Sequence, residues 1–192
     1  ELKARKSKPT HSITLTQWKA DKLDEVPSVD SDKQFNRQSD TAEDSMGNIE
    51  WASWSWNPVT GCKHDCSYCY ARDIAARFYP QGFEPTIHPD RLAAPYNTKL
   101  PKDVETHIAK RNVFANSMSD LYGRWVPQAW IDAVFKSMAD NPQWNFLTLT
   151  KFPKRAAELV YPENVWIGTS VDLQARVAAA EAAFKQIQCG VK

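Results

Sequence analysis

Apolar segments of strand length alternate with helix-like segments from Ile49 to the end of the sequence. The strand-like segments are rich in apolar and β-branched residues, which is typical of parallel strands that helices cover on both faces. We therefore predict an α/β domain over residues 49–192. Its predicted strands cover 50–56, 112–117, 144–150 and 164–171, and its predicted helices cover 68–79, 126–142, 152–160 and 172–187.

Local signals indicate where two of these helices begin. Pro127 opens the helix over 126–142, because the fixed φ of proline suits a first helical turn. Trp130 and Val134 recur with the helical period and predict the buried face of this helix. Asp172 precedes the last, alanine-rich helix and is a candidate for its N-terminal cap.

Residues 1–48 differ in composition from the rest of the chain. They are polar, carry charges of both signs and show no sustained apolar period. This composition predicts a linker or a largely disordered tail. Within it, residues 12–18 (SITLTQW) alternate well enough to predict one short strand. The chain begins with Glu1 and ends as its last predicted helix ends, so we expect a piece of a longer protein, truncated at Lys192.

Polar residues gather at the predicted carboxyl ends of the strands. Right-handed crossovers would wind such a sheet in one sense, toward a barrel or an open doubly wound sheet. Ligands bind at the carboxyl ends of the strands in both architectures. Here these ends read WNPVTGC, NSMSD, TLTK and GTSV. Their Ser, Thr, Asn, Asp and Lys side chains predict a polar rim that binds a ligand.

Composition narrows the functional classes only slightly. The 192 residues include 42% hydrophobic and 24% charged residues and carry a net charge of +1, as in an ordinary soluble globular protein. The near-neutral charge gives no overall electrostatic case for binding nucleic acid or a membrane. No apolar run approaches the roughly 20 residues of a membrane helix, and no secretory signal is visible. We therefore expect a cytoplasmic protein.

Three cysteines fall within one short stretch, TGCKHDCSYCYAR. A disulfide framework is disfavoured, because cytosolic thiols stay reduced. Structural zinc is a second interpretation, in which Cys66 and Cys69 form a half-site and Cys62 or His64 contributes. An iron–sulfur cluster is the third, because cysteine thiolates hold such clusters. Three thiolates on a 4Fe–4S cluster would leave one iron free to bind a substrate or cofactor.

The spacing of Cys62, Cys66, Tyr68 and Cys69 resembles the Cys-x₃-Cys-x-aromatic-Cys motif of the radical S-adenosylmethionine (radical SAM) superfamily. The resemblance implies that the three cysteines hold a 4Fe–4S cluster whose free iron chelates S-adenosylmethionine. It places Tyr68 near the adenine of that cofactor. It also implies reductive cleavage of S-adenosylmethionine to a 5′-deoxyadenosyl radical, which abstracts a hydrogen atom from the substrate.

A narrower resemblance covers about residues 49–192. The stretches WNPVTGC, HPDRL, VFANSMSDLYG, VPQAWIDAVF, FLTLTKFPKR and NVWIGTSV look like phage-associated radical-SAM-like proteins of unassigned function. The superfamily resemblance implies an incomplete parallel (β/α) barrel, that is, a partial TIM barrel. Four strands are predicted here, against the eight of a complete barrel. The missing part could hold the substrate pocket, so the fragment could be inactive alone.

The sequence departs from the superfamily pattern after the second strand. Many radical SAM enzymes carry a Gly-Gly-Glu stretch there, which binds the methionyl amino group, whereas this chain has NSMSD. Spore photoproduct lyase-like enzymes look similar in using a Thr/Ser-Asp pair at this point. The likeness implies cofactor contacts from Asn116, Ser117, Ser119 and Asp120. Asp120 could instead cap the next turn.

Lys151 and Ser170 are further candidates for cofactor binding. Lys151 follows the third predicted strand and could meet a carboxylate or phosphate of the cofactor or substrate. Ser170 lies at the end of the fourth and could bind the ribose or carboxylate of the cofactor. A solvated position at a strand end is the alternative for both.

The predicted function is therefore an iron–sulfur-cluster-binding radical SAM enzyme domain that acts on an unknown substrate. Its expected partners are S-adenosylmethionine and a reductant protein such as flavodoxin or ferredoxin. A non-catalytic, zinc-stabilised binding module is one alternative. A nucleic-acid-modifying radical SAM enzyme similar to photoproduct lyase is another, which the net charge does not support. The sequence assigns no catalytic residue.

Overall fold

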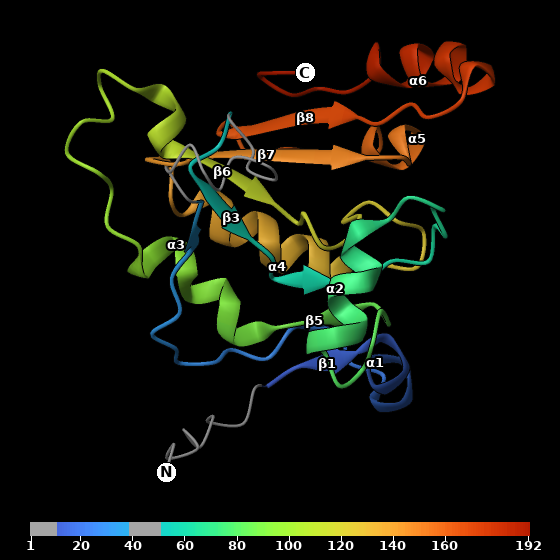
Figure 1. Cartoon of the computed structure of the whole chain (residues 1–192), viewed down its shortest axis with the longest axis horizontal. Helices are drawn as coiled ribbons and strands as arrows, with labels where there is room; N and C mark the ends of the chain where they lie inside the picture. Colours follow the sequence, from blue (N-terminus) through green and yellow to red (C-terminus); the bar gives the residue numbers. More distant parts are fainter. Residues whose placement is uncertain (1–10, 39–50) are drawn as a thin grey trace.

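The computed structural model describes residues 11–38 and 51–192, which form a mixed α/β structure with two sheets (Figure 1). The larger sheet has five strands in the order β2-β3-β6-β7-β8, and the smaller has three in the order β1-β5-β4. The strands are β1 (Ile13–Thr14), β2 (Asn36–Arg37), β3 (Trp54–Trp56), β4 (Val59–Thr60), β5 (Thr86–Ile87), β6 (Asn112–Ala115), β7 (Asn145–Thr150) and β8 (Val165–Thr169). The α-helices are α1 (Leu15–Asp21), α2 (Tyr70–Phe78), α3 (Ala94–Asn97), α4 (Gln128–Ala139), α5 (Pro153–Ala156) and α6 (Val177–Phe184).

The larger sheet is parallel from β3 through β6 and β7 to β8, while β2 is antiparallel to β3. Beyond β8, Val191 forms a parallel bridge with Trp166, so the parallel order extends past α6. The carboxyl ends of β3, β6, β7 and β8 therefore share one edge, toward the right in Figure 1. The described residues form no closed barrel. A partial barrel stays a prediction.

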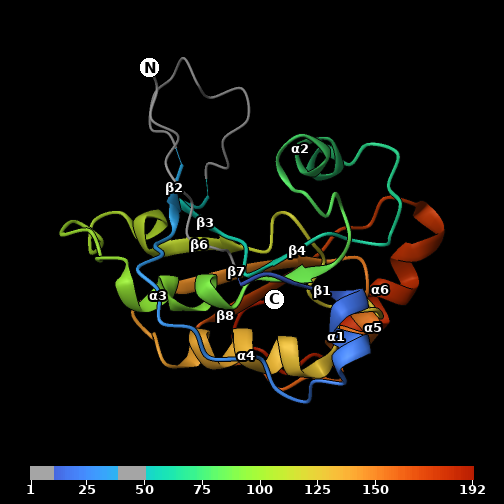
Figure 2. The ribbon, with the colours of Figure 1, turned by 90° about the horizontal axis from the view of Figure 1, so that it is seen from below.

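The predicted pattern of buried strands and amphipathic helices is confirmed where its signals are strongest. β6 is buried at all four positions, and α4 begins directly after Pro127. Trp130 and Val134 of α4 are fully buried, and the helix covers one face of the sheet (Figure 2). None of the helices among the described residues is long and apolar enough to cross a membrane.

Two local predictions are wrong. Only Ile13 and Thr14 of the segment 12–18 form a strand, because a capping box starts α1 directly afterwards. The Gln17 amide donates to the Thr14 hydroxyl (3.2 Å), and the Thr14 amide donates to the Gln17 side chain (2.9 Å). Asp172 does not cap the last helix. Arg176 occupies the N-cap of α6, after a 3₁₀ turn over Gln174–Arg176.

Much of the segment predicted as a linker or tail packs against the domain. Residues 1–10 and 39–48 lie outside the described residues, but 11–38 contribute Leu15, Trp18 and Phe35 to the core. The prediction did not foresee that these three side chains pack against the domain. Isolated apolar residues in a polar stretch give no periodic signal, yet each can fill a gap in a core that the rest of the chain builds.

An aromatic cluster at the centre of the fold holds β3 in place. The ring of Phe35 lies 6.0 Å from that of Trp56 and 5.1 Å from that of Trp144, both edge-to-face. Trp54 and Phe146 complete the cluster around Phe35 at 6.4 Å and 6.2 Å. Such pairs stabilise a fold beyond the apolar area they bury. The cluster thus anchors β3, from which the chain passes through β4 to the cysteine loop.

Buried His88 links the N-terminal segment to the smaller sheet. Its Nδ1 lies 2.7 Å from the Ser12 hydroxyl and its Nε2 lies 2.8 Å from the Thr60 hydroxyl. Burial, with a smaller contribution from the charge of Arg91, lowers the pKa of His88 to about 3. The imidazole is therefore neutral at physiological pH.

We expect His88 to make the fold less stable in mild acid. In the unfolded chain a histidine has a pKa of about 6.5, so between about pH 6.5 and 3 the unfolded state binds more protons. Stability is then lost as the pH falls, by about 1.4 kcal/mol between pH 7.5 and 5.5. Urea unfolding of the wild type and His88→Gln at both values checks this. The variant should lack this loss, and equal losses in the two proteins would contradict the assignment.

Candidate metal and ligand site

The cysteine loop, residues 61–69, lies beyond the carboxyl ends of β3 and β6 (Figure 1). It begins at Gly61, whose amide donates to the Met118 carbonyl at 2.9 Å. Gly61 has φ +82°, and a Cβ at this position would lie 2.3 Å from the Glu84 carbonyl oxygen. The loop ends at Cys69, the N-cap of α2. Backbone packing on both sides therefore fixes the path into the loop.

Cys62, Cys66 and Cys69 are half-buried free thiols in this loop. Burial is the largest cause that raises the pKa of the Cys62 thiol, to about 11, and negative charge on Asp120, Cys66 and Cys69 adds to it. A Cys62 thiolate is therefore costly unless a positive group lies beside it. Three thiols in one short loop, one of which is costly to ionise without a cation, fit a metal or cluster, because these bind thiolates.

A second group of possible metal ligands shares one residue, Cys66, with the three cysteines of the loop. His64, Cys66 and Asp172 each offer one ligand atom, and these atoms lie within 4.8 Å of one another. His64 Nε2 is buried and has no hydrogen-bond partner among the described residues. Nitrogen, sulfur and carboxylate oxygen are all zinc ligands, and three of them leave the fourth tetrahedral position open. The geometry thus offers a single-ion site that shares Cys66 with the three-cysteine set.

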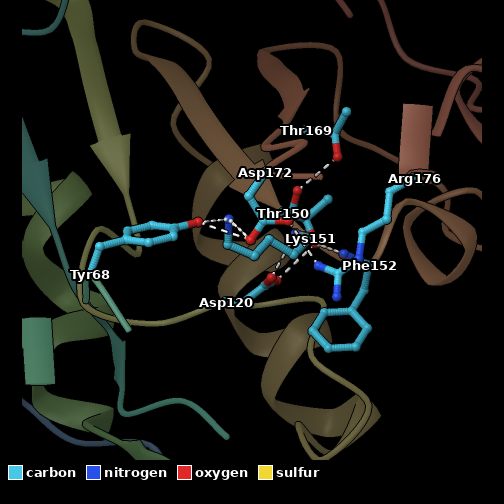
Figure 3. A network of polar contacts seen from close by, with 8 residues as sticks. All are labelled: Tyr68, Asp120, Thr150, Lys151, Phe152, Thr169, Asp172 and Arg176. Atoms are coloured by element: carbon cyan, nitrogen blue, oxygen red, sulfur yellow. Dashed lines mark hydrogen bonds and ion pairs between the residues drawn. The ribbon is translucent and has the colours of Figure 1, made fainter. Parts of the chain in front are cut away.

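Tyr68, Lys151 and Asp172 form a polar clasp between the cysteine loop and the ends of β7 and β8 (Figure 3). The Tyr68 hydroxyl donates to Asp172 at 2.9 Å and accepts from Lys151 Nζ at 2.7 Å. Lys151 Nζ lies 3.3 Å from the Asp172 carboxylate, and Arg176 donates to the same carboxylate at 2.8 Å. The bond from Tyr68, followed by that from Lys151, lowers the pKa of Asp172 to about 2. The clasp therefore carries a carboxylate at neutral pH.

Asp120 is a buried carboxylate that holds the end of β7 by hydrogen bonds. Its carboxylate accepts from the Thr150 hydroxyl at 2.9 Å, the Lys151 amide at 2.8 Å and the Tyr122 amide at 3.1 Å. The residue is only 7% exposed, and burial raises its pKa. The bond from Tyr122 matches the alternative in which Asp120 caps the next turn. Three of the roughly four positions at which this carboxylate can accept a hydrogen bond are used within the protein, and its contact with a bound ammonium stays a prediction.

The other residues of NSMSD also make contacts within the protein. Asn116 has φ +62°, and its side-chain carbonyl accepts from the Val59 amide at 3.3 Å. Ser117 pairs with the Asn57 side chain, and Ser119 donates to the Val59 carbonyl at 3.0 Å. These bonds tie the end of β6 to β4. In this stretch the buried amide nitrogen of Asn116 lacks a partner among the described residues. Contacts of Asn116, Ser117 and Ser119 with a ligand stay predictions.

A pocket of about 390 Å³ opens beside the clasp. His64, Lys151 and Ser170 line it, so the structure brings two of the predicted cofactor residues to one cavity next to the cysteine loop. Tyr68 adjoins these residues through Lys151, whereas Ser117, Ser119 and Asp120 face the protein. Volumes of this size are typical of small-molecule sites.

Sequence reasoning missed Asp172 as a member of the site. It lies just after GTSV, so the rule that ligands bind where parallel strands end could have found it. Of the basic side chains that line the pocket it identified Lys151 but missed Arg124, Lys154, Arg155 and Arg176. Cys189 lies apart from the loop, and its thiol donates to the Val165 carbonyl at 2.9 Å.

Comparison with known families matches residues 46–192 to one described as a protein of unknown function (DUF5131). No curated protein and no solved structure shows a significant match.

Proposed function

The chain belongs to the DUF5131 family of proteins of unknown function, and we propose that it is a radical SAM enzyme domain. One observation carries the proposal. Three half-buried thiols, at Cys62, Cys66 and Cys69, lie in a single loop at the carboxyl edge of four parallel strands, next to a pocket. Metal-assisted chemistry in parallel α/β folds takes place at this edge.

In this proposal Cys62, Cys66 and Cys69 would hold a 4Fe–4S cluster. When bound, cluster and S-adenosylmethionine together would supply a carbon radical by reductive cleavage of the cofactor. The protein would position these groups and exclude water. Tyr68 and Lys151 lie where they could contact the cofactor beside the loop, and Asp172 holds both side chains in place.

The order of the strands supports a partial barrel as the fold of this enzyme. β3, β6, β7 and β8 are neighbours in the sheet in the same order as in the chain, and a helix separates each of the last three from the strand before. Val191 adds to β8 in the same direction. Successive parallel neighbours joined by helices are how a (β/α) barrel is built.

A zinc site is the second candidate, and the convergence of His64, Cys66 and Asp172 favours it. In that case Cys66 would bind a single ion, and Cys62 and Cys69 would not be needed. The module would then be stabilised by its metal. The two candidates share one ligand and differ in all others, so single substitutions can separate them.

Anaerobic reconstitution with iron and sulfide tests the proposal. We expect about four irons and four sulfides per chain, with a reduced-cluster electron paramagnetic resonance signal that changes when S-adenosylmethionine is added. Cys69→Ala should lose the iron, and His64→Gln should keep it. Cys189→Ala is the matched control, because this thiol lies outside the loop.

The zinc candidate predicts the reverse pattern. One zinc per chain, lost in His64→Gln and kept in Cys69→Ala, would replace the radical SAM proposal with a metal-stabilised module. Iron that binds without any response of its signal to S-adenosylmethionine would also overturn the enzyme proposal.

A further inference from the structure

The pocket beside the cysteine loop is lined by positive charge. Arg124, Lys151, Lys154, Arg155 and Arg176 line it together with His64, and no carboxylate is among its lining residues. The whole chain is nearly balanced, with 24 basic and 23 acidic residues. Five of the basic residues therefore meet in one cavity, and the net charge of +1 hides this local excess.

The charges of the pocket are only partly compensated. Lys151 and Arg176 share the single carboxylate of Asp172. Arg155 donates to the carbonyls of Gly123 and Val126. The charges of Glu158 and Asp120 act on its guanidinium from nearby, but neither carboxylate forms an ion pair with it among the described residues.

Within the part of the chain that the structure describes, Arg124 and Lys154 have no hydrogen-bond or ion-pair partner. Both are exposed at the pocket, so their charges are available to a ligand. Cations gathered in a concave site raise the local concentration of anions and attract phosphate strongly.

One wall of the pocket is apolar. Phe152 packs edge-to-face against His64 at 5.4 Å and against Trp125 at 5.2 Å, so its ring is held rigidly. Pro153, Val171 and Ala179 extend the apolar lining. Thr169 and Ser170 add hydroxyl groups. Figure 3 shows Phe152 and Arg176 on the side of Lys151 away from Tyr68. The cavity thus offers cations for a phosphate and an aromatic wall for a planar group.

We propose that this pocket binds a nucleotide through its phosphate, with the nucleoside against the Phe152 wall. The volume of about 390 Å³ exceeds what a bare phosphate ion needs. A free nucleotide and a nucleotide within a single strand present the same chemistry. The site depends on neither iron nor S-adenosylmethionine, and it remains if the proposed enzyme activity fails.

Calorimetric titration of the purified chain with adenosine, AMP, inorganic phosphate and a short single-stranded oligothymidylate tests the proposal. AMP or the oligonucleotide should bind saturably, more tightly than adenosine or phosphate alone. Raising the salt concentration should weaken binding. The double variant Arg124→Gln/Lys154→Gln should lose about tenfold or more in affinity. Lys99→Gln/Lys102→Gln removes the same charge from exposed lysines outside the pocket lining and should bind like the wild type.

The arms of this titration also identify the source of the nucleotide. AMP binding as tight as that of the strand indicates a free nucleotide, and binding of the strand alone indicates nucleic acid. The proposal fails if no phosphate-bearing probe binds or if adenosine binds as well as AMP. It also fails if the two double variants lose affinity equally, because the effect would then be one of overall charge.

Discussion

Gly61→Ala is expected to destabilise the fold and to displace the cysteine loop. The backbone at Gly61 has φ +82°, where an L side chain is strained, and a Cβ would lie 2.3 Å from the Glu84 carbonyl oxygen and 2.5 Å from its carbon. Both contacts are with backbone, so no side-chain rotation can relieve them. Strain and clash together should cost about 3 kcal/mol in the free energy of unfolding. Urea denaturation and the iron content after reconstitution measure the two effects.

Gly82→Ala is the matched control for this substitution. Gly82 has φ +59°, but a Cβ there would meet nothing within 4 Å. Its loss of stability, about 1 kcal/mol, reports the conformational cost alone. The difference between the two variants therefore isolates the clash with Glu84. Equal losses in the two variants, or full iron binding by Gly61→Ala, would show that the backbone contact does not set the position of the loop.

Phe35→Ala is expected to lower the free energy of unfolding by about 3–5 kcal/mol. Phe35 is 6% exposed, and its ring packs against Trp54, Trp56, Trp144 and Phe146. Its removal leaves a cavity at the centre of an aromatic cluster that cannot easily collapse. Chemical denaturation followed by tryptophan fluorescence measures the loss, and the environment of the neighbouring indoles should change as well.

The same substitution decides how residues 11–38 relate to the domain. Phe78→Ala is the control, because Phe78 is 73% exposed, and its loss should stay within about 0.5 kcal/mol. If Phe35→Ala costs no more than the control, this segment is a linker, as its polar composition predicts. A large loss instead establishes that it belongs to the core.

The elements with repeated apolar signals could be predicted from the sequence. The four buried positions of β6 and the stripe of α4 recur at fixed spacing, so periodicity alone identifies both. Phe35 could not be placed, because one apolar residue in a polar stretch has no period. Its position depends on a cavity that residues more than a hundred positions later help to form.

The candidate site could be predicted in part, from the cysteine spacing and from the polar residues Lys151 and Ser170 where two strands end. The cysteine spacing is local, and the position of the cysteines beyond a strand end follows from the parallel pattern. The clasp could not be foreseen, because Tyr68 and Asp172 are 104 positions apart, and Tyr68 and Lys151 are 83 apart. The bond of Ser119 to β4 and the bonds of Asp120 to the end of β7 could not be foreseen either, although the contact of Asp120 with the next turn was a stated alternative. Their side chains form bonds that depend on how β4 and β7 approach β6.

The antiparallel strand β2 determines which edge of β3 is available for pairing with further strands. Its pairing with Trp54 and Ser55 occupies the outer hydrogen-bonding edge of β3. A protected edge cannot recruit another strand, whether from this chain or from a neighbouring molecule. While β2 stays paired, no other strand can pair with β3 on that side, and on the opposite side of the sheet Val191 joins β8. A ring closed through β3 would first have to displace β2, so the sheet as described cannot close at this strand.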